Sequence, residues 1–315
     1  MPIFLGIDGG GTKTTCALGD GKRVLATGEG GGSNIVRCGE AQTLASIHEA
    51  MRNACAAGGI KPDAIESACI GAAGASLPDV SAQIKRIAAG MLACPVLVVG
   101  DMVIALAAAF GNGPGVIAIA GTGSIAYGRD SEGRTARAGG WGFAISDEGS
   151  GQWIGRTAVA QALRRHDEGK DSRLVAGLLQ AWPAASIDDL VRAANATPPA
   201  DFSRLFPAVL EAADGGDTTA RETLVAAGVQ LADLAKVVLQ RLFPDVYASV
   251  PVAMAGGVLR QSALVRQSFF NDVRATFPTA LVNPTLMEPV LGALELARNR
   301  ATFLALASGK GAQPQ

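Results

Sequence analysis

The 315-residue sequence predicts an α/β protein of two similar domains with a cleft between them. Near the N-terminus, short apolar runs alternate with segments of helical periodicity, an order typical of α/β layers. A strand, a Gly-Thr turn and a second strand begin at Ile3 and again at Val116. This restart indicates a duplicated domain, and the chain is long enough for two.

The first half of the chain is expected to follow the order βββαβαβα. Gly/Asp turns separate the first three β-type runs, which predicts an antiparallel meander. The unbroken apolar run at 96–99 is typical of a buried parallel strand. The expected strands are 3–7, 14–18, 23–27, 65–71 and 96–99, and the expected helices are 40–56, 80–91 and 101–110.

The second half begins with another expected meander and continues into a long helical region, about 150–243, with polar breaks that indicate loops. An apolar strand and a last helix follow. The meander strands are 116–120, 125–129 and 136–139, the breaks are 167–172, 197–201 and 214–218, the later strand is 250–254 and the last helix is about 290–307.

We place the N-terminal domain at 1–113 and the C-terminal domain at 114–289. The last helix, about 290–307, is expected to pack back on the N-terminal domain. The polar tail at 310–315 is expected to be disordered, as chain ends often are.

Composition limits the partners of the protein. The net charge is −1 and no stretch is rich in Lys or Arg, so we expect neither nucleic acid nor a membrane as a partner. No apolar stretch is long enough to span a bilayer, and the N-terminus lacks the basic region of a signal peptide. The five cysteines are scattered, as reduced thiols are, and the two histidines lack zinc-site spacing. We expect a cytoplasmic homodimer.

The turn after the first strand carries the residue types of a polyphosphate site. Its glycines let the backbone approach a charged oxygen, and its threonines and lysine add hydroxyl donors and a positive charge. Asp8, at the end of the apolar run, is placed to hold Mg²⁺ directly or through water. The phosphate-binding candidates in this turn are Gly10, Gly11, Thr12, Lys13 and Thr14.

Two other phosphate loops do not fit this turn. A Walker A loop needs Gly-Lys-Ser/Thr followed by a helix, but Thr12 separates Gly11 from Lys13 and a strand follows. A dinucleotide-binding loop also needs a following helix. A plain hairpin turn is the remaining alternative, although one glycine would suffice for it. The second turn, Gly121, Thr122, Gly123 and Ser124, is interpreted in the same way and is expected to hold the phosphates from the other side.

Together these residues resemble the acetate and sugar kinase/Hsp70/actin superfamily, whose two domains are ribonuclease H-like. The turns resemble its two phosphate motifs, and the run at 255–258 resembles its adenosine motif, with Gly256 and Gly257 against the nucleoside. Within the superfamily, the chain resembles the N-acetylglucosamine kinase branch of the BadF/BadG/BcrA/BcrD ATPase family. The specific part is GGWG at 139–142 followed by SDEGSG at 146–151, in which Ser146 replaces a usual Gly.

Asp101 follows the strand at 96–99 and begins a helix. The resemblance implies that it is the catalytic base, which accepts the proton of the 6-hydroxyl of the sugar. The helix N-terminus favours its ionised form. The alternative is a simple helix cap, a role that Asp fills well.

The resemblance also implies a sugar site. Trp141 would give the ring an apolar wall and Asp147 would bind hydroxyls, whereas an ordinary core aromatic and a solvated turn are the alternatives. Ser33 and Asn34 follow a glycine-rich loop and would contact hydroxyls or the acetamido group; Asn34 in such a loop is often only a turn residue. The full set of sugar-site candidates is Ser33, Asn34, Asp101, Gly123, Trp141, Gly142, Asp147 and Glu148.

The expected activity is the transfer of the γ-phosphate of ATP, with Mg²⁺, to the 6-hydroxyl of N-acetylglucosamine. Glucosamine and N-acetylmuramate-type sugars are alternative acceptors. An ATPase activator of a dehydratase or reductase would need closely spaced cysteines for an iron–sulfur cluster, which this sequence lacks. A silent sugar-sensing protein would not need Asp8, Lys13 and Asp101 together.

Overall fold

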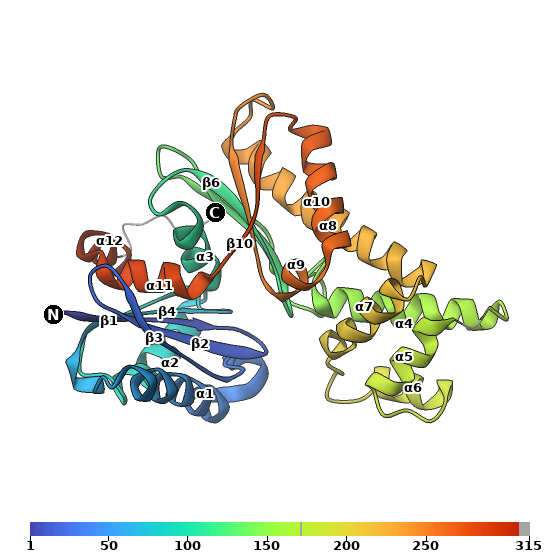
Figure 1. The fold of residues 1–315 in the computed structure, drawn as a ribbon, viewed down its shortest axis with the longest axis horizontal. Coiled ribbons are helices and arrows are strands. Elements are labelled where there is room, and N and C mark those ends of the chain that lie inside the picture. The colour runs from blue at the N-terminus through green and yellow to red at the C-terminus, as the bar shows by residue number, and fades with distance from the viewer. Residues whose placement is uncertain (171, 309–315) are drawn as a thin grey trace. The chain divides into compact units, whose positions relative to one another are not determined.

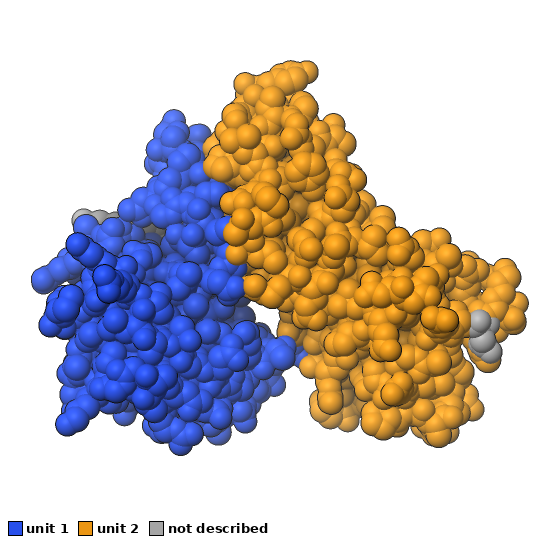
Figure 2. Space-filling view, in the orientation of Figure 1, with its two compact units in different colours: residues 1–117, 127–137, 287–315 blue, residues 118–126, 138–286 orange. Residues whose placement is uncertain are grey.

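The computed structural model describes residues 1–170 and 172–308. Contacts divide the chain into two compact units, coloured separately in Figure 2. Unit 1 contains residues 1–117, 127–137 and 287–315, and unit 2 contains residues 118–126 and 138–286. Residues 127–137 therefore group with the N-terminal part of the chain, and the domain boundary between 113 and 114 stays a prediction.

The sheet of unit 1 has five strands in the order β3-β2-β1-β4-β5. The first three strands form the predicted antiparallel meander, with Ile7 opposite Cys16. Strands β4 and β5 continue the sheet in parallel, with Ile70 opposite Val98, which confirms the expected buried parallel strand. The strands are β1 (Ile3–Gly9), β2 (Lys13–Gly19), β3 (Val24–Gly31), β4 (Ile65–Ala72) and β5 (Val96–Gly100).

Helices cover both faces of this sheet (Figure 1). Helices α1 (Ile35–Gly58) and α2 (Pro78–Ala89) form one apolar core with this sheet. The short helix η1 (Pro62–Ala64) connects α1 to β4. Helix α3 (Asp101–Phe110) belongs to the core on the other face, with α11 (Pro289–Arg298). Gly39, at φ +77°, interrupts α1, and the part after it matches the predicted helix 40–56.

The expected single last helix is wrong, because two helices occupy this segment: α11 (Pro289–Arg298) and α12 (Arg300–Ala307). Asn299 has an extended backbone, and its side chain accepts a hydrogen bond from the Thr302 backbone N–H as the N-cap of α12. The cap satisfies a free donor at the start of the new helix. The predicted disordered tail lies outside the described residues.

Helix α11 packs against β1 and α3 at contacts that leave no room for side chains. A Cβ on Gly6 would lie 2.4 Å from the Leu294 nitrogen, and one on Gly292 would overlap the Ile104 carbonyl oxygen. The C-terminal helix therefore completes the core of unit 1.

The second sheet has five strands in the order β10-β9-β6-β7-β8, and the two five-stranded sheets confirm the α/β class. Strand β10 is not among the predicted elements. It carries Pro284 and is an edge strand of the sheet, a position where a missing backbone N–H is tolerated. The strands are β6 (Gly115–Ala120), β7 (Ser124–Arg129), β8 (Thr135–Gly139), β9 (Pro251–Ala255) and β10 (Leu281–Met287).

Unit 2 contains the predicted long helical region. The break expected at 197–201 falls between helices. The other two, at 167–172 and 214–218, also contain a loop, but Asp167, Asp214 and Thr218 are end residues of the adjoining helices, and residue 171 is not described. Residues 182–186 form a further, unexpected break. The helices are α4 (Gly151–Asp167), α5 (Arg173–Ala181), α6 (Ile187–Ala194), η2 (Phe202–Leu205), α7 (Phe206–Asp214), α8 (Thr218–Leu242), α9 (Gly257–Gln261) and α10 (Ala263–Thr276).

Candidate functional site

The first Gly-Thr turn joins β1 to β2 in unit 1 and presents Gly11, Thr12 and Lys13 at the surface. The Gly10 N–H donates to the Lys13 carbonyl oxygen at 3.0 Å, which closes the turn. The Ser33 N–H donates to the Gly10 carbonyl oxygen at 3.0 Å and so ties the loop after β3 to the turn. The exposed top of the turn is therefore held by hydrogen bonds beneath it.

The hydroxyls of Thr14 and Ser33 lie underneath the turn. Both side chains are buried, and their oxygens are 2.7 Å apart. The Thr14 hydroxyl also donates to the Gly31 carbonyl oxygen at 2.7 Å. The structure thus places these two predicted ligand residues inside the turn, where their side chains support its shape. Asn34 is half-buried, and its Oδ1 caps α1 by accepting from the Val36 N–H at 3.2 Å.

Lys13 forms an ion pair with Glu29 on the neighbouring strand. The Lys13 Nζ to Glu29 Oε1 distance is 2.8 Å, and both side chains are about two-thirds exposed. An exposed pair of this kind contributes at most about 1 kcal/mol. Lys13 can therefore leave Glu29 for a phosphate at little cost.

Asp8 and Asp101 are close enough to interact electrostatically at the carboxyl ends of β1 and β5. The pKa of Asp8 is raised from 3.8 to about 7, mainly by burial and then by the negative charge of Asp101; Lys13 lowers it and Glu288 adds a smaller rise. Burial also raises the pKa of Asp101, against the opposing effect of the Met102 N–H, which donates to its Oδ1 at 2.9 Å. Two desolvated carboxyls beside each other are typical of a catalytic or cation site.

The donor set at Asp8 fits Mg²⁺. Carboxylate oxygens are its preferred protein ligands, usually one or two with the remaining positions filled by water and phosphate oxygens. Asp8 is half-buried in a region of unbalanced negative charge, and a cation there would favour its ionised form.

Glu288, the residue before α11, is a neighbour of Asp8 that the sequence analysis missed. Its position in the chain gives no hint of this, because nearly the whole sequence separates the two residues. Only the packing of α11 against β1 brings Glu288 to the end of that strand. A Glu before a Pro at a helix start otherwise indicates only a helix boundary.

The second turn, between β6 and β7, is fixed to the start of α4. The Gly151 N–H donates to the Gly121 carbonyl oxygen at 2.8 Å, and the Gln152 N–H donates to the Thr122 carbonyl oxygen at 3.3 Å. The Ser124 hydroxyl donates to the Glu148 carbonyl oxygen at 2.8 Å. These bonds join the turn to the SDEGSG run, so the structure brings together two segments that the resemblance had linked.

The loop between β8 and α4 presents Trp141 to solvent, with 64% of its surface exposed, and Gly142 is exposed beside it. Trp141 is therefore not a core aromatic. Asp147 is buried at φ +66°, and a Cβ on Gly123 would lie 2.9 Å from its Oδ2. Glu148 accepts a hydrogen bond from the Ser146 hydroxyl at 2.8 Å. A buried carboxyl at positive φ against the second turn is uncommon for a solvated turn and typical of functional loops.

The glycines of the adenosine-like motif follow β9. Gly256 has φ +100°, and a Cβ there would lie 2.2 Å from the carbonyl oxygen of Ala120, the residue before the second turn. Only glycine fits this approach. A Cβ on Gly257, the first residue of α9, would make only an ordinary van der Waals contact, with Gln261 Nε2 at 3.7 Å. The motif therefore lies directly beside the second turn.

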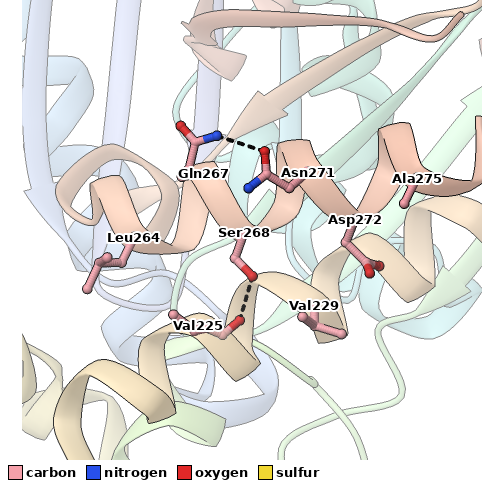
Figure 3. Close-up of a pocket in the computed structure, with 8 residues that line it drawn as sticks. All are labelled: Val225, Val229, Leu264, Gln267, Ser268, Asn271, Asp272 and Ala275. Atoms are coloured by element: carbon pink, nitrogen blue, oxygen red, sulfur yellow. Dashed lines mark hydrogen bonds between the residues drawn. The ribbon is translucent and has the colours of Figure 1, made fainter. Parts of the chain in front are cut away.

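A separate groove lies in unit 2, between α8 and α10 (Figure 3). It has a volume of about 440 Å³ and contains no predicted site residue. The Ser268 hydroxyl donates to the Val225 carbonyl oxygen at 2.8 Å, and Gln267 donates to Asn271 at 2.8 Å. Because these polar groups are already paired, we assign the groove no function.

The cysteines do not assemble into a site within the described residues. Cys16, Cys55 and Cys69 are buried, and burial raises the pKa of each thiol. In the described part of the chain, no group of three His, Cys, Asp or Glu side chains is arranged to hold a metal by itself. No helix in that part is long and apolar enough to cross a membrane.

Comparison with known proteins identifies relatives over nearly the full chain. An N-acetylmuramic acid/N-acetylglucosamine kinase from Clostridium acetobutylicum is 30% identical over 95% of this chain and 99% of that protein. An N-acetyl-D-glucosamine kinase from Dictyostelium discoideum is 29% identical over 94% and 98%. A solved structure from Chromobacterium violaceum, provisionally assigned as an N-acetylglucosamine kinase, is 27% identical over 95% and 99%, with a TM-score of 0.75. Residues 5–297 match the BadF/BadG/BcrA/BcrD ATPase family, and the chain therefore belongs to this family.

Proposed function

We propose that this protein is an ATP-dependent amino-sugar kinase that phosphorylates the 6-hydroxyl of N-acetylglucosamine, in the cytoplasm and as a homodimer. The observation that carries the proposal is the pair of desolvated carboxyls, Asp8 and Asp101, at the end of the sheet that bears the first Gly-Thr turn. The similarity to sugar kinases over nearly the full chain supports the same reaction class.

In this proposal, Asp101 is the base. Its carboxylate accepts the proton of the 6-hydroxyl while the sugar oxygen attacks the γ-phosphorus of ATP. The bond from that phosphorus to the bridging oxygen breaks, and ADP leaves. A pKa raised by burial makes the carboxylate a stronger proton acceptor than an exposed one.

The remaining residues position charge around the transferred group. Lys13 and the backbone N–H groups of the two turns neutralise the phosphate oxygens. Asp8 would hold Mg²⁺, which supplies charge neutralisation and orientation of the phosphates when it is bound. Trp141 and Asp147 would bind the sugar ring and its hydroxyls, and Gly256 would let adenosine lie against the backbone.

A coupled assay of ADP release over a panel of hexoses and amino sugars tests the proposal. We expect turnover that depends on an amino sugar. ATP hydrolysis that is indifferent to sugar would contradict it and would favour an ATPase of another type.

The Asp101→Asn variant tests the role of the base. We expect kcat to fall by far more than tenfold while sugar binding is retained, and Asp63→Asn, an exposed change in the same unit, to have no effect. A kcat within about tenfold of wild type, a loss of only ~1.4 kcal/mol, would exclude Asp101 as the base.

A further inference from the structure

Two buried side-chain atoms on neighbouring strands of unit 1 have no hydrogen-bond partner. They are Arg129 Nε, at the end of β7, and Thr135 Oγ1, at the start of β8. Only one other such atom, Ser172 Oγ, occurs in the described part of the chain. Buried polar atoms are nearly always paired in folded proteins, so two unpaired ones at the same place indicate a missing partner.

The turn between β7 and β8 places these two side chains together. The Asp130 N–H donates to the Arg134 carbonyl oxygen at 3.0 Å, which pairs these residues across the turn. Arg129 and Thr135 are the next residues inward, so they lie opposite each other and their side chains leave the same face of the hairpin. Tyr127 shares that face by strand alternation, is buried, and has its hydroxyl near that of Thr135.

Arg129 also contacts the segment that links α3 to β6. Its Nη2 donates to the Gly111 carbonyl oxygen at 2.7 Å and to the Gly113 carbonyl oxygen at 2.9 Å. These two bonds hold the guanidinium in a fixed position. The Nε–H of the same group is buried and has no acceptor, so one donor of a well-ordered side chain is left over.

The guanidinium lacks a balancing negative charge as well. Among the residues that the structure describes, no carboxylate forms an ion pair with Arg129. The adjacent Asp130 is paired with Arg134, whose Nε lies 2.6 Å from its Oδ2. Burial lowers the pKa of Arg129, as expected for a cation that is partly removed from water. A bound water would satisfy the unpaired atoms but would leave this charge uncompensated.

The donors define the ligand that fits. The Nε–H of Arg129 and the hydroxyls of Thr135 and Tyr127 can all donate to one acceptor between them. An acceptor that carries a negative charge also balances the guanidinium. Because Arg129 Nε and Thr135 Oγ1 are both buried, a ligand that contacts both is small and compact.

We propose that Arg129, Thr135 and Tyr127 bind a monatomic halide, chloride in particular, beneath the segment that links α3 to β6. The ion would join the β7–β8 hairpin to the chain that follows the helix of Asp101. This site is separate from the nucleotide and sugar residues, and the inference does not depend on the kinase function.

Thermal unfolding followed by circular dichroism tests the site in the full-length protein. We expect Tm to be about 2–4 °C higher in sodium chloride than in sodium gluconate of equal ionic strength, because an ion that binds only the folded state stabilises it. Arg129→Gln should abolish this difference. Arg86→Gln, a change of an exposed arginine in the same unit, should retain it and so controls for general effects of salt.

Thr135→Val removes one donor while it keeps the shape of the side chain and the charge of Arg129. We expect half of the Tm shift to need about 5- to 10-fold more chloride in this variant. The variant keeps the proposal testable even if Arg129→Gln does not fold.

Crystals grown in sodium bromide identify the ligand directly. We expect an anomalous bromide peak in contact with Arg129 Nε and Thr135 Oγ1. Density without an anomalous signal would overturn the proposal, because it would identify a water. Equal Tm values of wild type in chloride and gluconate would also overturn it, as would a chloride effect that is the same in wild type, Arg129→Gln and Thr135→Val.

Discussion

Replacing Asp8 by Asn should stabilise the protein when nucleotide and metal are absent, and the gain should grow with pH. The folded state raises the pKa of Asp8 from 3.8 to about 7. Between these values, the folded chain binds more protons than the unfolded chain. The free energy of unfolding of wild type must therefore fall as the pH rises through this window and level off above pH 7. Asn stays neutral and escapes this loss.

The size of the effect follows from the shift. One pKa unit corresponds to 1.36 kcal/mol, so a rise from 3.8 to about 7 corresponds to about 4 kcal/mol at pH 8. Water reaches part of this half-buried side chain and screens its charge. We expect the Asn variant to be more stable by about 2–4 kcal/mol at pH 8 and by less than about 1 kcal/mol at pH 4.

Urea unfolding in EDTA at pH 4 and pH 8 measures the difference. The three tryptophans, Trp141, Trp153 and Trp182, all lie in unit 2, so circular dichroism is the appropriate signal and hydrogen exchange at β1 localises the change. Asp20→Asn is the control of opposite sign. Hydrogen bonds from the Arg23 and Lys22 N–H groups lower the pKa of Asp20, so its replacement should destabilise the protein at pH 8 and matter less in acid.

Two results would refute this reasoning. If Asp8→Asn were no more stable than wild type at pH 8, the carboxyl would not be strained by burial and by its neighbours. If the gain were the same at pH 4 and pH 8, it would come from packing and not from charge.

Two further changes test the turns. Glu29→Gln should free Lys13 for the nucleotide and lower the KM for ATP about two- to fivefold, the value of an exposed ion pair, while the KM for the sugar stays the same; an unchanged KM for ATP would indicate that Lys13 does not reach the phosphates. Gly256→Ala should cost about 2–4 kcal/mol of stability, measured by thermal unfolding, because its Cβ would clash with the Ala120 carbonyl oxygen at φ +100°. Gly257→Ala is the matched control and should be neutral, and equal losses in both variants would contradict the argument.

The local elements of unit 1 could be predicted because their signals are local. Glycine turns and apolar periodicity place β1, β2 and α3 within a residue or two of the expected bounds, whereas β3 runs four residues beyond its expected end. Strand β10 was missed because Pro284 and its exposed polar residues hide a strand at the end of a sheet. The split of the last helix at Asn299 was missed because the apolar pattern continues on both sides of the cap.

In the candidate site, too, local sequence signals could not predict contacts that only the folded chain makes. Residue type predicts that Thr14 and Ser33 can donate hydrogen bonds, but only the folded turn shows that their hydroxyls face each other inside it. Glu288 reaches Asp8 through the packing of α11, which no spacing in the sequence reveals. The small pocket lined by Gln152, Arg156 and Phe202 depends on the return of residues 199–202 to α4, a contact between segments more than 40 residues apart.

The packing of α11 into unit 1 has a consequence for how the protein is made. The first strands leave the ribosome early, but Leu294, which packs on Ala17, is synthesised after all of unit 2. At ~5–20 residues per second, the stretch between Ala17 and Leu294 takes roughly 15–55 s to translate. During that time the apolar surface of unit 1 that α11 will cover stays exposed on the nascent chain. The order of synthesis therefore delays completion of the unit that carries Asp8 and Asp101 until the polypeptide is almost finished.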